Sequence, residues 1–68
     1  MLGLGRDKAL GALVGVTVLV PADGGLVKGR VASVTRRWLT LEECEADGRL
    51  LEGRLMVRLP VAFVQVIA

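Results

Sequence analysis

The chain lacks several residue types on which enzymes and metal sites depend. Its 68 residues include no histidine and no tyrosine, and cysteine, tryptophan and phenylalanine occur once each. The absence of histidine excludes a histidine-based triad and the common zinc sites. The single cysteine, Cys44, excludes an internal disulfide and fits a reducing compartment. We therefore expect a cytoplasmic protein that is not an enzyme and holds no metal or other cofactor.

Neither positive nor negative charge is in large excess. The chain has nine basic and seven acidic residues, so its net charge is +2, and no long run of like charge occurs. Such a chain lacks the dense positive charge of a tight duplex-binding protein. A nucleic-acid role therefore requires that the basic residues gather on one face or that several copies assemble.

Apolar residues, by contrast, make up 53% of the chain and are mostly valine and leucine. This composition excludes disorder and favours strands. The length fits one domain over residues 1–68, in a range where a core is small and assembly often adds stability.

The start of the chain allows two interpretations. Basic residues precede an apolar run over 9–20, and Val20-Pro21-Ala22 resembles a cleavage site, as in a secretory signal. Against this, Asp7 lies in the basic region, valines alternate over 14–20 as in a strand, and residues 23–68 alone lack a disulfide. The run is also too short to span a bilayer, so we expect no membrane association.

Hydrophobic periodicity outlines the secondary structure. Residues 7–13 can form a short helix, and Asp23-Gly24 and Ala46-Asp47-Gly48 have the composition of turns. Period-two alternation predicts five strands, over residues 14–20, 26–35, 38–43, 49–59 and 61–67. In the second and fourth strands, Gly29 and Gly53 are central and are each followed by arginine. Central glycines mark sharp bends, so the prediction is an all-β, strongly bent small barrel of Sm-like or SH3-like type with a short N-terminal helix.

The alternation also assigns side chains to faces. The inward positions are Val27, Gly29, Val31, Leu39, Leu41, Leu51, Gly53, Leu55, Val57 and Leu59. Leu19, Leu50 and Met56 point outward although they are apolar, and Pro60 leaves the edges of the last two strands unpaired. We expect a homo-oligomer in which copies pair these edges.

The order of these parts resembles the Sm-like superfamily, which includes LSm proteins and bacterial Hfq. The similar segments are the lead Leu13-Val14-Gly15, the spacing from Asp23-Gly24 to Gly29, and the segments Leu39-Thr40-Leu41, Val57-Arg58 and Ala62-Phe63-Val64-Gln65-Val66. The resemblance covers nearly the whole chain. It implies a homo-oligomeric ring, formed by pairing of strand four with strand five of the next copy, that binds single-stranded RNA.

One group of residues has the chemistry for such a ligand. Arg36 and Arg37 can neutralise phosphates, Trp38 can stack on an unpaired base, and the resemblance places Arg58 at the same pore. We expect these four residues to bind RNA weakly and with little sequence specificity.

A second interpretation stays open. Arginines at a turn are often merely solvated, and a lone tryptophan often belongs to a core or an interface. The family's uridine-binding Asp and Asn have no counterpart in Thr35-Arg36-Arg37-Trp38. An SH3-like structural or protein-interaction module without nucleic-acid binding is therefore the alternative. Glu42, Glu43 and Glu45 are interpreted as a solvated face beside an unreactive Cys44.

Overall fold

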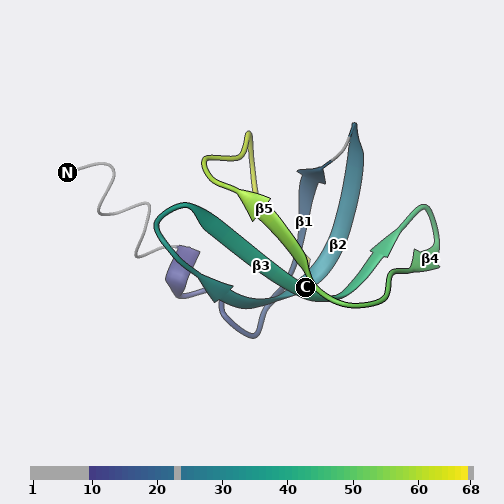
Figure 1. Ribbon diagram of the computed structural model, residues 1–68, viewed down its shortest axis with the longest axis horizontal. Coiled ribbons are helices and arrows are strands. Elements are labelled where there is room, and N and C mark those ends of the chain that lie inside the picture. Colours follow the sequence, from purple (N-terminus) through teal and green to yellow (C-terminus); the bar gives the residue numbers. More distant parts are fainter. Residues whose placement is uncertain (1–9, 23, 68) are drawn as a thin grey trace.

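The computed structural model describes residues 10–22 and 24–67 and forms one antiparallel sheet (Figure 1). Its strands are β1 (Thr17–Ala22), β2 (Gly25–Val34), β3 (Trp38–Ala46), β4 (Arg49–Leu50), β5 (Leu55–Arg58) and β6 (Gln65–Val66). The order across the sheet is β4-β3-β2-β1-β6. Strand β5 lies off this path and pairs with the first half of β3, whereas β4 pairs with the end of β3. The predicted all-β class is confirmed, with six strands instead of five.

The sheet is strongly bent, but hydrogen bonds do not close it into a barrel. Within the described residues, β5 pairs only with β3 and β6 pairs only with β1. Val66 lies opposite Val18, which is fully buried, yet Val66 itself is half exposed. Cross-strand partners share a face of the sheet. The inner face is therefore open beside β6, and the outer edges of β5 and β6 stay available.

The predicted fourth strand, over 49–59, is instead two strands. Gly53 has a positive φ of 81° and lies in the connection between β4 and β5, so it does not bend a continuous strand. The reason is the hairpin turn: Asp47 and Gly48 also have positive φ, and Ala46 pairs with Arg49. After that turn β4 follows β3 for two residues only, and the chain must cross over before β5 pairs with the first half of β3.

The first strand begins later than predicted. Val14 is 52% exposed, and Gly15, with φ of 89°, donates its N–H to the carbonyl of Val31 at 2.8 Å before β1 starts. The strand also continues through Pro21 to Ala22, beyond its predicted end at residue 20. The Thr17 carbonyl accepts a hydrogen bond from the Ile67 N–H. Backbone groups alternate in direction along a strand, so those of Thr17, Leu19 and Pro21 point toward the side of β1 on which β6 lies. Because β6 pairs only with Val18 and Leu19, the missing N–H of Pro21 interrupts no pairing there.

The last predicted strand and the predicted N-terminal helix also differ from the structure. The last strand, predicted over 61–67, is reduced to the two residues of β6. Most of the predicted helix over 7–13 falls on residues 7–9, outside the described part. Residues 10–15 form successive turns in which Leu13 donates its N–H to the carbonyl of Leu10 at 3.0 Å. Nowhere in residues 10–22 or 24–67 is a helix long and apolar enough to cross a bilayer.

Gly29 lies where β2 bends most closely over β3. The β2–β3 register shifts between Lys28 and Arg30 and again between Val31 and Ser33, which marks two bulges. A Cβ at position 29 would lie 3.0 Å from both Cys44 Sγ and Leu41 Cβ. The prediction that Gly29 permits a bend is therefore confirmed: the absence of a side chain lets the two strands approach.

The core lies inside this bend. Its buried side chains are those of Val18, Val20, Val27, Val31, Leu39, Leu41, Cys44 and Val57. The inward positions predicted on β2 and β3 are all buried, whereas Leu51 is 40% exposed. Burial raises the pKa of the Cys44 thiol, against a smaller lowering by a backbone hydrogen bond at Leu55. The thiol is thus expected to be unreactive because it is buried, and not because of its glutamate neighbours.

Replacing Gly29 by alanine is expected to destabilise the domain by about 1–3 kcal/mol, because the added methyl group overpacks the contact with Cys44 and Leu41. Denaturant unfolding measures the change. Gly25→Ala is the matched control, since nothing lies within 4 Å of a Cβ there. Equal unfolding midpoints for the two variants would contradict the close approach.

Cys44 in the folded protein is expected to react with an aromatic disulfide reagent at least about a hundredfold more slowly than in denaturant. Its pKa is raised, so at any pH from 7 to 9 a smaller fraction of the folded thiol than of the unfolded thiol is ionised, which adds to the slower labelling of the folded chain. Absorbance of the released thiolate measures both rates. Equally fast labelling of the folded protein is incompatible with a side chain that is 1% exposed.

Candidate nucleic-acid interface

The turn between β2 and β3 presents two arginines at its tip. Thr35 donates its N–H to the Trp38 carbonyl at 2.8 Å, and the Thr35 hydroxyl accepts from the Trp38 N–H at 3.1 Å. Threonine is suited to this position because its hydroxyl can satisfy a nearby backbone N–H within the turn. Both bonds close the turn across Arg36 and Arg37, whose side chains are exposed.

Strand β5 brings a third arginine to the same place. Arg58 pairs with Trp38 across the β3–β5 ladder, and the Leu59 N–H donates to the Arg37 carbonyl at 2.7 Å. Arg58 Cζ lies over the Trp38 ring, 5.8 Å from its centroid, as in a cation–π contact. The structure thus brings together all four residues that the sequence singled out, here called the arginine–tryptophan patch: Arg36, Arg37, Trp38 and Arg58.

Trp38 is not a core residue. It is 37% exposed, and the buried core lies on the other face of β3, at Leu39 and Leu41. Of the two structural interpretations of a lone tryptophan, burial in the core is therefore wrong. The indole is therefore partly exposed, with one guanidinium, that of Arg58, over its ring.

Of the four other basic side chains in the described residues, three are paired with acids and Arg49 is not. Arg30 Nη2 contacts Glu42 at 2.8 Å and Glu43 at 3.0 Å, Lys28 contacts Glu45 at 3.4 Å, and Arg54 contacts Glu42 at 3.9 Å. The hydrogen bonds that Arg30 donates to Glu42, followed by the charge of Glu43, raise the pKa of Arg30. From the sequence alone these glutamates are expected to be merely solvated, because only the cross-strand register shows that Glu42 and Glu45 lie opposite Arg30 and Lys28.

Charge is consequently divided along β3. Its second half contains the glutamates, which pair with basic side chains from outside β3. Its first half lies beside the three arginines of the patch, two in the preceding turn and one on β5. None of these three arginines forms an ion pair with any residue in 10–22 or 24–67. Their charges are free to act on a ligand, although the chain as a whole is nearly neutral.

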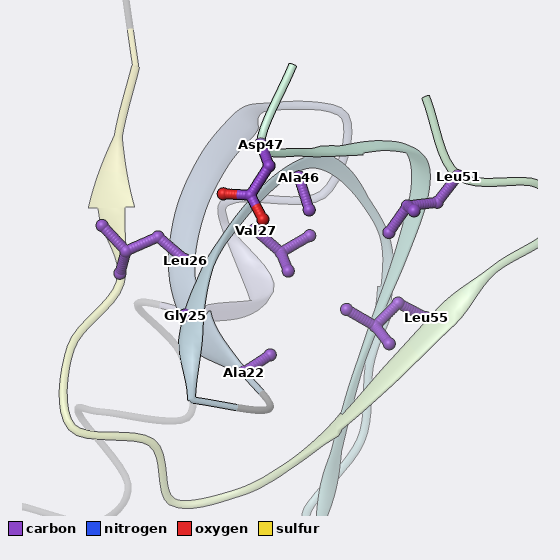
Figure 2. Close-up of a pocket in the computed structure, with 8 residues that line it drawn as sticks. All are labelled: Ala22, Gly25, Leu26, Val27, Ala46, Asp47, Leu51 and Leu55. Carbon is purple, nitrogen blue, oxygen red and sulfur yellow. The ribbon is translucent and has the colours of Figure 1, made fainter. Parts of the chain in front are cut away.

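A pocket of about 180 Å³ lies at the opposite end of the β2–β3 hairpin. Figure 2 shows Val27, Leu51 and Leu55 converging, with the Asp47 carboxylate beside them. The remaining described lining residues are Ala22, Gly25, Leu26 and Ala46. Apolar walls with one carboxylate supply neither a nucleophile–base pair nor a metal site. Throughout the described residues, no three side chains of metal-binding type are grouped.

Comparison with family models, curated proteins and solved structures found no match for this chain. The resemblance to the Sm-like superfamily therefore rests on the quoted residues of this chain, and the functional interpretation rests on the geometry of the patch.

Proposed function

We propose that this chain is an Sm-like protein that binds single-stranded RNA weakly and with little sequence specificity through the arginine–tryptophan patch. The observation that carries the proposal is a partly exposed indole with Arg58 over its ring and two exposed arginines in the adjoining turn, none of the three paired with an acid among the described residues. Guanidinium groups bind phosphates and aromatic rings stack on unpaired bases, which together hold single strands.

The proposal includes assembly into a homo-oligomeric ring. Strands β5 and β6 each have one described neighbour, so each leaves an edge on which another copy can add a strand. Pairing β5 of one copy with β6 of the next joins two different surfaces, and such contacts make rings when the rotation closes. A ring repeats the patch around its axis, which offsets the small net charge of one chain.

A protein-interaction module is the second candidate. It is favoured by exposed apolar side chains near the pocket: Leu26 is half exposed, Leu50 is 80% exposed and Leu51 lines the pocket itself. Such a module needs neither the arginines of the patch nor nucleic acid. Measurements on RNA therefore separate the two candidates.

Removing the two turn arginines is expected to weaken RNA binding. Arg36→Ala with Arg37→Ala should lower affinity for a labelled uridine-rich strand roughly tenfold at low salt. The slope of log affinity against log salt should fall by about 1.4, at about 0.7 for each lost phosphate contact. Fluorescence anisotropy at several salt concentrations measures both quantities.

The matched control removes the same charge elsewhere. Arg49→Ala with Arg54→Ala also loses two positive charges, but at the end of β3 that carries the glutamates. It should change affinity and slope much less. If the two double variants bind equally, the patch is not the binding site, and if wild type binds no RNA, the protein-interaction candidate takes its place.

The edge of β6 offers a direct test of assembly. The Ile67 N–H donates to Thr17, so the Val66 N–H, one residue earlier, faces the free edge. Val66→Pro should remove a donor needed by a second copy without removing a β1–β6 hydrogen bond. In native mass spectrometry the wild type should be a single species larger than a dimer, Val66→Thr should match it, and Val66→Pro should be a monomer. A monomeric wild type would exclude the ring.

A further inference from the structure

The patch contains hydrogen-bond donors far in excess of acceptors. Arginine donates and cannot accept, and all three charged side chains of the patch are arginines. Three nearby oxygens each already accept one hydrogen bond: the Thr35 hydroxyl accepts from Trp38, the Trp38 carbonyl accepts from Thr35, and the Arg37 carbonyl accepts from Leu59. Because the patch offers mainly donors, a base bound there would be recognised mainly through its own hydrogen-bond acceptor atoms.

Arg58 is close enough to Trp38 to donate hydrogen bonds to the acceptors of such a base. Direct stacking on the ring would bring Cζ to about 3.5–4.0 Å from it, whereas the distance to the centroid is 5.8 Å. The guanidinium is thus not stacked on the centre of the indole. Because Arg58 is exposed and not held against the indole, its flexible side chain can reach the edge of a base that stacks on Trp38, where a planar guanidinium can donate two parallel hydrogen bonds.

We propose that, in the RNA binding proposed above and on which this inference rests, each patch prefers guanine: the base stacks on Trp38 and Arg58 donates to O6 and N7. Guanine combines the larger purine ring with two adjacent acceptors, the arrangement that arginine contacts bidentately. Adenine has the same ring size, but its N6 amino group is a donor beside N7. Cytosine also carries an amino donor, and both pyrimidines offer a smaller stacking surface.

The expected preference is modest because the site is exposed. A bidentate contact at such a site should favour guanine over adenine by about five- to tenfold. One base per patch is discriminated, so the RNA as a whole is still bound with little sequence specificity.

The test compares short uridine tracts that differ in one central nucleotide. Their affinities for the wild-type oligomer are measured by fluorescence anisotropy, with guanosine, adenosine, cytidine or 7-deazaguanosine at the central position. The guanosine tract should bind about five- to tenfold more tightly than the adenosine tract. The 7-deaza base keeps the ring size and O6 but lacks the N7 acceptor, so it should lose most of this preference.

Arg58→Lys provides the protein side of the same comparison. Lysine keeps the positive charge but lacks the planar pair of donors. The variant should bind the guanosine tract no better than the adenosine tract, and this ratio of affinities is the readout whatever the overall affinity of the variant. Arg49→Lys, on β4, is the matched control and should keep the guanine preference.

The outcomes distinguish the two levels of the proposal. Measurable binding with equal affinities for the four tracts overturns the guanine preference and leaves RNA binding intact. Absence of binding to all four overturns the proposed function together with the preference. The 7-deaza comparison uses only wild-type protein, so it decides the role of N7 even if Arg58→Lys fails to fold.

Discussion

The close approach of β2 and β3 at Gly29 is the constraint on which the rest of the structure depends. A Cβ at that position would lie only 3.0 Å from Cys44 Sγ and Leu41 Cβ, so a side chain there would press the two strands apart. One register shift spans Gly29 and a second follows between Val31 and Ser33, as expected where paired strands bend. Without the bend, the valines and leucines of the sheet would lie on an open face, because no helix within the described residues covers them.

The bend also determines how charge is distributed. Strand β3 pairs along its length with β2, at its start with β5 and at its end with β4, so side chains from three other strands meet it. The register sets Arg30 against Glu42 and Lys28 against Glu45, whereas Arg58 meets Trp38. A chain of almost balanced composition therefore has one end where charges cancel and another where arginines remain without described ionic partners.

Much of this could be predicted from the sequence because it follows from local pattern. The alternation around Gly29 and Leu39 identified the inward faces, and Asp47-Gly48 identified a hairpin turn. Gly53 could not be assigned in this way, since a glycine in a bend and one with positive φ look alike in a sequence. The patch was identified residue by residue, but the contact of Arg58 with Trp38 and the pairing of Arg30 with two glutamates depend on long-range register, which composition does not encode.

The geometry also explains why a small net charge is no argument against an anionic ligand. Electrostatic attraction at a protein surface depends on charges within about a Debye length, near 8 Å at physiological salt, and not on the total. Pairing of the glutamates with Arg30, Lys28 and Arg54 limits their field, which leaves the charge at the β2–β3 turn largely uncompensated by described residues. The turn lies at the start of β3, where β5 also ends, so assembly through the β5 edge would set the patch next to the contact between copies. Binding of RNA at the patch and pairing of strand edges would then favour one another, since a strand that spans two patches is held only while the copies stay joined.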